Sequence, residues 1–356
     1  MRVLVAGGGT AGHVSPLLAL ADRLVADDAT TKILALGTAT GLEARLVPAR
    51  GYELHEIPRV PLPRRLGVDV ARMPARLGAA VTSAGTAIKR IDAEVVVGFG
   101  GYVAAPAYLA ARRAKVPIVV HEQNSRPGFA NRLGARMTKW VAVSFPGTPL
   151  RHAVRTGLPL RPEIVALDRA ASRAGARASF GLQPDTRTVL VVGGSLGAQR
   201  LNDVVPAIAA DLAGRGVQVL HVSGTGKEFA PPSPSYAVVP YVEAMELAYA
   251  AADVVIARAG ANTVSELTAL GLPAVYVPLP IGNGEQRLNA EPVVAAGGGL
   301  MVDDAAFDTG WLRQFLLPLL EDPDRLAAMG EAAKGFGVLD ADERLADLVR
   351  AAVAGR

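Results

Sequence analysis

Candidate catalytic chemistry begins with His13, which closely follows a run of glycines. The segment VLVAGGGTAGHVSP predicts a strand, a glycine loop and a helix, with His13 at the start of that helix. The positive end of a helix dipole disfavours the charged imidazole, and a neutral imidazole can accept a proton. His13 is therefore a candidate general base. The alternative is a histidine that only hydrogen-bonds the backbone at the helix start.

A polar cluster follows another apolar run. His121, Glu122, Gln123 and Asn124 come directly after VPIVV, which predicts a strand. Burying four polar side chains is costly and a turn does not require them, so the pattern favours a solvated site for a polar ligand. Glu122 is the reserve candidate for the general base. The simpler interpretation is a turn formed by Asn124 and Ser125.

A second glycine loop begins the other half of the chain. VLVVGGSLGAQRLND, which starts near Val189, repeats the order of strand, loop and helix, with Ser195 between glycines. Unpaired N–H groups at such a helix start, together with the helix dipole, suit a phosphate or another anion. The loop therefore predicts a site for a pyrophosphate.

A later strand end carries a carboxylate. DVVIARAGANTVSEL predicts a strand that ends at Arg258 and a helix that starts at Asn262 or Thr263. Glu266 in this helix either forms a capping box with Thr263 or accepts the two hydroxyls of a ribose. Both interpretations remain open.

The next loop-to-helix junction carries two amides. VYVPLPIGNGEQRLNA places Glu285, Gln286 and Asn289 there. Amides suit sugar hydroxyls because they both donate and accept hydrogen bonds. The junction therefore predicts contacts to a sugar.

The first glycine loop also matches G-x-G-x-x-G, the pattern of dinucleotide-binding proteins. Such a site needs an acidic residue at the end of the second strand to hold the ribose hydroxyls. KILALGTATG has Gly37 and Thr38 there, and the next acid, Glu43, comes too late in the chain. The sequence therefore does not favour an NAD or FAD site.

These residues must be positioned by alternating strands and helices. Short β-rich runs alternate with alanine-rich helical stretches in both halves, which predicts parallel, doubly wound sheets with ligand groups at the carboxyl ends of the strands. Strands are expected near 2–6, 32–36, 94–98, 117–120 and 140–144, and near 188–192, 217–222, 236–239, 253–256, 273–277 and 299–302.

The predicted fold class is α/β, with two Rossmann-like, doubly wound parallel-sheet domains that face each other across a cleft. A chain of 356 residues is longer than one core usually serves. The segment TGLPLRP at 156–162 interrupts regular structure. We therefore expect domains at 1–160 and 161–339, with 340–356 packing back on the first.

Composition narrows the class of protein. Hydrophobic residues make up 50% and aromatic residues only 5%, as expected for alanine- and valine-rich α/β cores. The absence of cysteine excludes disulfides, thiolate metal sites and a cysteine nucleophile, and it fits a reducing cytoplasm. The predicted first strand leaves no room for a signal peptide, and no apolar run reaches the length of a membrane span.

Basic residues gather between Arg59 and Leu77. Five arginines stand there against one acid, among apolar residues that include Leu66 and Met73. Such a segment can rest on an anionic membrane face, and the simpler interpretation is a solvated loop and helix. Nucleic acid is not favoured as a partner, because aromatic residues are not interleaved with the arginines.

Metal dependence is not expected. The D-x-D pairs Asp322–Asp324 and Asp340–Asp342 fall in the helical C-terminal region, away from any predicted strand end. They are interpreted as helix caps and surface acids.

Together these motifs resemble the MurG family of GT-B glycosyltransferases. GGGTAGHVSP, FGGY, HEQN, GLPLR, GGSLGAQ, RAGANTVSE and EQRLNA occur in the order and spacing of that family over nearly the whole chain. By position, the resemblance implies His13 as the candidate base. It implies contacts to sugar or nucleotide from Thr10, Ala11, Gly12, Asn124, Arg161, Ser195, Val242, Ala261, Asn262, Thr263, Glu266 and Gln286. It also implies a membrane- or acceptor-facing group of Arg64, Arg65, Leu66, Arg72, Met73, Arg76 and Tyr102.

The resemblance implies inverting transfer of GlcNAc from UDP-GlcNAc to the 4-hydroxyl of MurNAc in undecaprenyl-pyrophosphoryl-MurNAc-pentapeptide. This is the last cytoplasmic step of peptidoglycan precursor synthesis, performed without a cofactor by a peripheral protein on the cytoplasmic membrane face. The alternatives are an enzyme like UDP-GlcNAc 2-epimerase, which shares the bilobed fold, and a non-catalytic UDP-sugar-binding protein.

Overall fold

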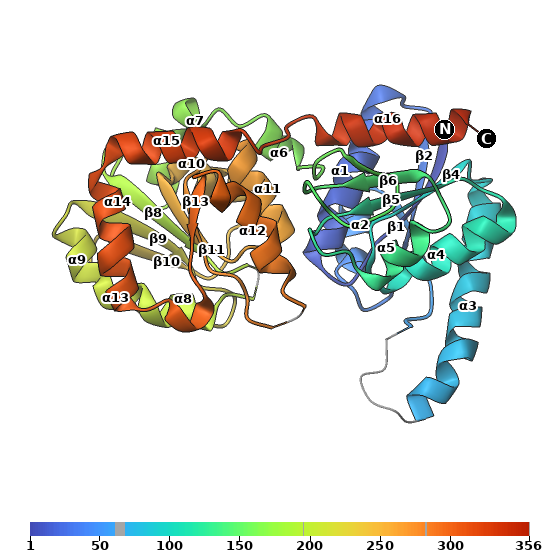
Figure 1. The fold of residues 1–356 in the computed structure, drawn as a ribbon, viewed down its shortest axis with the longest axis horizontal. Coiled ribbons are helices and arrows are strands. Elements are labelled where there is room, and N and C mark those ends of the chain that lie inside the picture. Colours follow the sequence, from blue (N-terminus) through green and yellow to red (C-terminus); the bar gives the residue numbers. More distant parts are fainter. Residues whose placement is uncertain (61–67, 195, 282, 356) are drawn as a thin grey trace. The chain divides into compact units, whose positions relative to one another are not determined.

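The chain folds into two compact units. The computed structural model describes residues 1–60, 68–194, 196–281 and 283–355, without the side chains of residues 11 and 68–72. Unit 1 comprises Met1–Arg161 and Leu339–Arg356, and unit 2 comprises Pro162–Val338. Each unit is a parallel sheet covered by helices (Figure 1). The expectation of two doubly wound α/β domains is confirmed.

The sheet of unit 1 has seven parallel strands within the described residues, in the order β3-β2-β1-β4-β5-β6-β7. The strands are β1 (Arg2–Ala6), β2 (Lys32–Gly37), β3 (Glu53–Glu56), β4 (Val95–Gly98), β5 (Ile118–Glu122), β6 (Trp140–Val143) and β7 (Ala153–Arg155). The order reverses between β1 and β4, which pair directly. The loops after these two strands therefore meet at the carboxyl edge of the sheet, where doubly wound sheets bind ligands.

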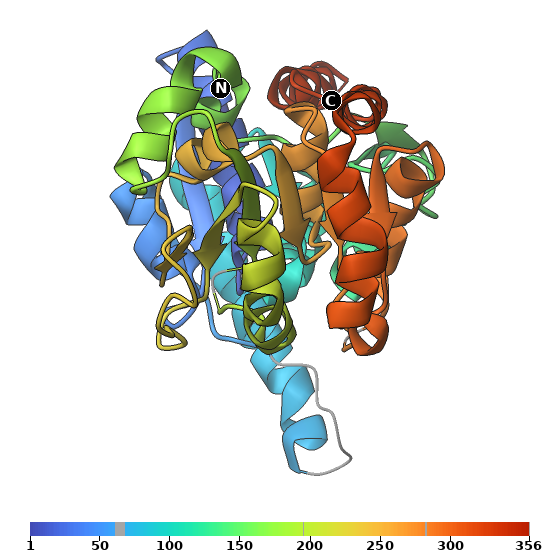
Figure 2. The ribbon, with the colours of Figure 1, turned by 90° about the vertical axis from the view of Figure 1, so that its left-hand side faces the viewer.

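The helices of unit 1 lie against this sheet. They are α1 (Ala11–Asp27), α2 (Glu43–Ala49), α3 (Val68–Ile91), α4 (Gly101–Ala114), α5 (Phe129–Gly134) and α16 (Ala341–Ala354). The C-terminal half of α3 is buried in the core through Ala80, Val81 and Ala84. Its N-terminal turns extend away from the sheet (Figure 1, Figure 2).

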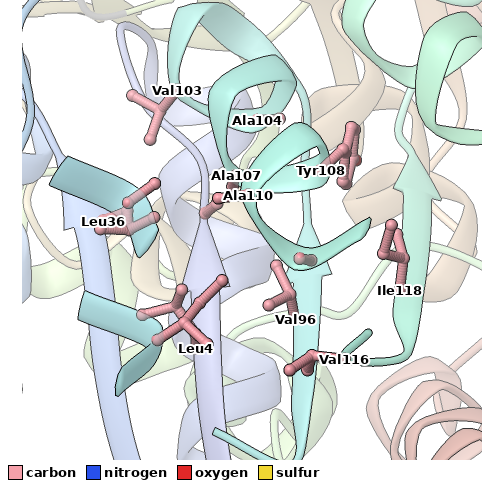
Figure 3. Packing of buried hydrophobic residues seen from close by; sticks show 14 of the residues in the cluster. Leu4, Leu36, Val96, Val103, Ala104, Ala107, Tyr108, Ala110, Val116 and Ile118 are labelled. Carbon is pink, nitrogen blue, oxygen red and sulfur yellow. The ribbon is translucent and has the colours of Figure 1, made fainter. Parts of the chain in front are cut away.

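Helix α4 shows how the sequence builds this layer. Its buried residues recur at helical spacing and pack on side chains of β1, β2, β4 and β5 (Figure 3). Tyr108 is fully buried and fills space next to Gly98 and Gly134, where any side chain would collide with its ring. The core is therefore formed by small residues of the helix set against large residues of the strands, with glycines making room for one tyrosine.

Helix α16 returns from the end of unit 2 to unit 1. It contacts α1 and β6, and Leu345, Ala346 and Val349 are fully buried with the apolar side chains of the first sheet. The last helix of the chain is thus part of the core of the first unit.

The sheet of unit 2 has six strands in the described part of the chain, in the order β10-β9-β8-β11-β12-β13. The strands are β8 (Arg187–Val192), β9 (Val217–Val222), β10 (Tyr236–Val239), β11 (Val254–Ala257), β12 (Ala274–Tyr276) and β13 (Gly299–Met301). Here the order reverses between β8 and β11, which places the second glycine loop beside the RAGAN segment.

The helices of unit 2 include several short ones. The α-helices are α6 (Pro162–Val165), α7 (Arg169–Ser179), α8 (Gln199–Val204), α9 (Ala209–Ala213), α10 (Met245–Ala251), α11 (Ala261–Ala269), α12 (Glu285–Ala295), α13 (Thr309–Trp311), α14 (Leu317–Glu321) and α15 (Pro323–Lys334). Two 3₁₀ turns lie at Pro206–Ile208 and Asp304–Ala306, and a π-helical turn lies at Leu312–Leu316. Among the described residues, no helix is both long and apolar enough to cross a membrane.

Candidate active site

The first glycine loop joins β1 to α1 and is held by a carboxylate. Oε2 of Glu43 accepts a hydrogen bond of 2.9 Å from the N–H of Gly9. Oε1 of Glu43 accepts two more of 2.9 Å, from the N–H and the hydroxyl of Thr38 at the end of β2. Glu43 follows the end of β2 by six residues, and the short turn after β2 brings its carboxylate back to the glycine loop, a contact that the sequence did not predict.

His13 lies in the first turn of α1. Its Nδ1 is 2.9 Å from the hydroxyl of Thr10, which precedes the helix and makes no capping bond to the backbone. Burial lowers the pKa of His13, and the carboxylate of Glu43 and the carbonyl of Gly8 oppose that shift without cancelling it. The imidazole is therefore neutral at pH 7, as a general base must be.

The loop after β4 packs directly against the loop after β1. Gly100 and Gly101 both have positive φ, of 88° and 74°. A Cβ at Gly100 would lie 3.3 Å from Nε2 of His13, and a Cβ at Gly101 would lie 2.5 Å from the carbonyl oxygen of Gly8. The two glycines therefore allow the FGGY backbone to approach His13. Tyr102 follows them, half-exposed, with the guanidinium of Arg59 5.5 Å from its ring centre.

Glu122 supports the loop that carries Asn124. Its carboxylate is buried and accepts hydrogen bonds of 2.9 to 3.0 Å from the N–H groups of Asn124 and Gly128 and from the side-chain amide of Asn131. Burial raises the pKa of Glu122, and these hydrogen bonds offset part of the rise. The geometry makes Glu122 a loop-holding residue.

His121 is fully buried and has a structural partner on each ring nitrogen. Nε2 lies 3.0 Å from the carbonyl of Gly157, and Nδ1 lies 3.2 Å from the amide nitrogen of Gln123. Burial lowers the pKa of His121 to about 4, against the opposing effect of the bond to Gly157. Three of the four polar side chains, those of His121, Glu122 and Gln123, are therefore buried, in contrast to the solvated site that the sequence favoured.

The glycine loop of unit 2 packs against a buried hydrogen-bond network. Gly197 has φ of +65°, and any side chain there would collide with the carbonyl of Ser223. The same carbonyl accepts a hydrogen bond of 2.9 Å from the side-chain amide of Asn202. The side-chain oxygen of Asn202 lies 2.9 Å from Nε2 of His221. Ser195, the loop's predicted ligand contact, lies outside the described residues.

Helix α11 begins at Ala261, with Gly260 as its N-cap and no side-chain cap. The sequence placed this start one or two residues later, and the proposed capping box between Thr263 and Glu266 is not formed. Oε2 of Glu266 instead accepts a hydrogen bond of 2.8 Å from the hydroxyl of Tyr249. Among the described residues, the buried amide oxygen of Asn262 has no hydrogen-bond partner. The helix start thus presents backbone donors and an unsatisfied acceptor.

Gln286 joins two loops of unit 2. Its side-chain oxygen accepts from the N–H of Ala259, at 3.1 Å, and from the N–H of Leu279, at 3.0 Å. The side-chain amide of Asn289 donates a hydrogen bond of 3.2 Å to the carbonyl of Ala259. These contacts fix the orientation of the Gln286 amide, so that only its nitrogen remains to donate to a ligand.

The remaining predicted site residues belong to several other segments of the chain. Val242 is buried in the loop between β10 and α10, and Arg161 is the last residue of the first segment of unit 1. Arg64, Arg65 and Leu66 lie outside the described residues, as do the side chains of Ala11 and Arg72. Met73 and Arg76 lie half-buried in the N-terminal turns of α3.

The two D-x-D pairs lie at helix starts. The side chain of Asp322 caps α15 by accepting 2.9 Å from the N–H of Arg325, and Asp340 pairs with Arg344 at the start of α16. Within the described residues no three His, Cys, Asp or Glu side chains form a group that could hold a metal ion.

Family matches cover both units. The glycosyltransferase family 28 N-terminal domain matches residues 3–143, and the glycosyltransferase family 28 C-terminal domain matches residues 188–345. The fold and these matches define a family 28 glycosyltransferase.

Relatives and solved structures narrow the class. UDP-N-acetylglucosamine–N-acetylmuramyl-(pentapeptide) pyrophosphoryl-undecaprenol N-acetylglucosamine transferase from Nocardioides sp. is 57% identical, over 98% of this chain and 97% of that protein. The protein of the same name from Streptomyces coelicolor is 55% identical, over 100% of this chain and 99% of that protein. The crystal structure of MurG from Acinetobacter baumannii has a TM-score of 0.79 at 30% identity, covering 98% of this chain and 99% of that one. The chain belongs to the MurG family of these transferases.

A UDP-GlcNAc 2-epimerase from Neisseria meningitidis, solved with UDP-GlcNAc, has a TM-score of 0.68 at 14% identity, covering 99% of this chain and 100% of that one. At that identity the likeness concerns the fold alone.

Proposed function

We propose that this protein transfers GlcNAc from UDP-GlcNAc to the 4-hydroxyl of MurNAc in undecaprenyl-pyrophosphoryl-MurNAc-pentapeptide. The observation that carries the proposal is the identity of more than 50%, over nearly the full length, to transferases named for these substrates. The neutral His13 in unit 1 and the uncapped start of α11 in unit 2 supply chemistry that such a transfer needs.

The reaction is a single displacement at the anomeric carbon. The acceptor hydroxyl gives its proton to the imidazole of His13, its oxygen bonds to C1 of GlcNAc, and the bond from C1 to the β-phosphate oxygen breaks with inversion. His13 is the base rather than Glu122, because three donors already occupy the carboxylate of Glu122. The contacts of Thr10, Ala11, Gly12 and Asn124 to the sugars remain part of this proposal.

The donor nucleotide is assigned to unit 2. The backbone at Ala261–Thr263 receives the phosphates at the uncapped start of α11, where N–H groups and the helix dipole offset negative charge growing on the leaving diphosphate. Glu266 accepts the ribose hydroxyls, with its carboxylate oriented by Tyr249. Gln286 donates to the sugar, Val242 contacts the uracil, and Ser195 contacts the diphosphate, as does Arg161, the last residue before unit 2 begins.

The membrane contact is assigned to the basic segment around the start of α3. The N-terminal turns of α3 extend away from the core of unit 1, and Met73 and Arg76 lie on them (Figure 2). Arginine and apolar side chains together suit an anionic membrane surface. The protein would then work as a peripheral enzyme on the cytoplasmic face, next to its lipid-linked acceptor.

Incubation with UDP-GlcNAc and a lipid-pyrophosphoryl-MurNAc-pentapeptide tests the reaction. The expected result is release of UDP together with a disaccharide product, and only when the acceptor is present. Release of UDP without the acceptor, or formation of a 2-epimer, would favour an epimerase. Binding of UDP-GlcNAc without any turnover would favour a non-catalytic sensor.

A further inference from the structure

The first glycine loop is hydrogen-bonded to a side chain of the protein itself, the carboxylate of Glu43. Glycine loops that enter helices commonly bind phosphate through their N–H groups. Here the N–H of Gly9 donates to Glu43 instead, and the side chain is only 1% exposed. A carboxylate from the chain itself therefore takes a position in which other proteins hold an anionic ligand.

The surrounding backbone leaves room for this carboxylate and for little else. Gly8, Gly37 and Gly41 surround it, and a Cβ at Gly8 would lie 2.5 Å from Oε1 of Glu43. A Cβ at Gly37 or Gly41 would come still closer to the side chain. Gly8 in the loop after β1, Gly37 at the end of β2 and Gly41 in the turn after β2 thus form one pocket around one side chain.

The pocket connects to the proposed base. The bond from Gly9 to Glu43 fixes the loop just before Thr10, and Thr10 contacts Nδ1 of His13. Among the described residues, Glu43 is the charged group whose field acts on His13, and it favours the protonated imidazole. The hydrogen bonds that Glu43 accepts outweigh the effect of burial and leave its own pKa below the usual value, so it is ionised at neutral pH.

We infer that Glu43 is a positioning residue for the glycosyl transfer, holding the Gly9–Thr10 turn so that His13 faces the acceptor hydroxyl. Its negative charge also stabilises the imidazolium that forms when His13 takes the proton. Glu43 touches neither substrate, and it acts only through the loop and through its field. This inference rests on the proposed function of His13.

The test uses the full-length protein with Glu43→Gln, which keeps the size of the side chain but removes the charge and one acceptor. We expect kcat to fall about 10- to 100-fold, as a small misplacement of a catalytic group does, with the dissociation constant for UDP unchanged. Thr38→Val removes a single donor to Glu43 and keeps the charge, so its loss should be smaller. Glu56→Gln, an exposed carboxylate on the neighbouring strand β3, is the control with unchanged turnover.

A readout that does not depend on turnover separates positioning from stability. NMR titration of the His13 ring should show a lower pKa in Glu43→Gln than in the unmodified protein, because the field that favours the imidazolium is gone. If Glu43→Gln lowers the unfolding temperature but leaves both kcat and the His13 titration unchanged, the inference is wrong. If the unmodified protein transfers no GlcNAc while the titration still shifts, the proposed function fails and the coupling between Glu43 and His13 stands.

Discussion

The hydroxyl of Tyr249 donates a hydrogen bond of 2.8 Å to Oε2 of Glu266, and both side chains are buried. The bond joins α10 to α11 inside unit 2 and fixes the orientation of the Glu266 carboxylate. A carboxylate oriented in this way can accept two vicinal hydroxyls with little loss of side-chain entropy.

Removing that carboxylate should weaken donor binding more than chemistry. We expect Glu266→Ala to raise KM for UDP-GlcNAc about 10- to 100-fold, because hydrogen bonds to a charged group each contribute ~1.5–3 kcal/mol, with a smaller effect on kcat. Tyr249→Phe should raise KM by less, since the carboxylate remains. Steady-state kinetics measure both variants against Glu331→Ala, an exposed site on α15. An unchanged KM in Glu266→Ala would leave the residue with a structural role only.

Removing the proposed base should slow the chemical step and leave donor binding intact. His13→Ala is expected to lower kcat by about 100-fold or more, the usual contribution of general-base catalysis. Because His13 belongs to unit 1 and the nucleotide is assigned to unit 2, calorimetry should give the same dissociation constant for UDP. Near-normal turnover in His13→Ala would show that another group takes the proton.

Acid should destabilise the protein through its buried histidines. Burial lowers the pKa of His121 to about 4 and that of His221 to about 3, whereas an unfolded chain protonates histidine near pH ~6.5. The unfolded state therefore binds more protons below pH ~6.5, and the free energy of unfolding falls with pH from there until the folded histidines titrate.

Urea titrations of the full-length protein at several pH values can check this slope. His121→Gln should reduce the loss of stability of unit 1 between pH ~6.5 and about 4, even though the variant is less stable at neutral pH. The control is His152→Asn, an exposed position with φ of +60°, a conformation that asparagine tolerates. An equal slope in His121→Gln and the unmodified protein would contradict the argument.

Turnover should survive removal of divalent metal. In the proposed mechanism the N–H groups at the start of α11 stabilise the leaving diphosphate, and the two D-x-D pairs lie at helix starts. We therefore expect the initial rate of UDP release to be retained in excess EDTA. Full loss of activity that magnesium restores would show that a metal ion shares this task.

Reversing charge in the basic segment should weaken membrane binding without loss of fold. Arg64→Glu with Arg65→Glu is expected to reduce co-sedimentation with vesicles that contain phosphatidylglycerol by about 10-fold or more, since each arginine contributes ~1 kcal/mol at an anionic surface. Arg112→Glu with Arg113→Glu, an exposed pair at the end of α4, makes the same change in charge elsewhere on unit 1. Equal loss in both double variants would indicate general electrostatics rather than a membrane-facing segment.

The sequence predicted the central strands of both sheets and the edge strands of unit 2, but neither edge strand of unit 1. Runs such as VLVV at β8 are apolar because both faces of a central parallel strand are covered, and that signal is strong. No strand was predicted at β3, whose residues are ELHE, or at β7, which is fully exposed. Both lie at the edges of the sheet, where one side lacks a neighbour and polar residues are tolerated.

The site was predicted by residue type, and its internal connections were not. The distance of Glu43 along the chain hid its contact with Gly9, which depends on the turn after β2. The glycines at 8, 37 and 41 were the available signal, because glycines at the ends of two neighbouring strands and in the turn that follows leave space for a side chain to pack between them. The capping-box pattern at Thr263 misled because Gly260 starts α11 earlier, which turns Glu266 toward Tyr249.

The return of α16 to unit 1 sets an order of events during synthesis. Residues 162–338 leave the ribosome as an uninterrupted segment and contain all of unit 2. Unit 1 still lacks Leu345 and Val349, which fill its core, until the last turns of the chain emerge. The domain translated first is therefore completed last, and a nascent chain that stalls before residue 339 would leave apolar core residues of unit 1 uncovered.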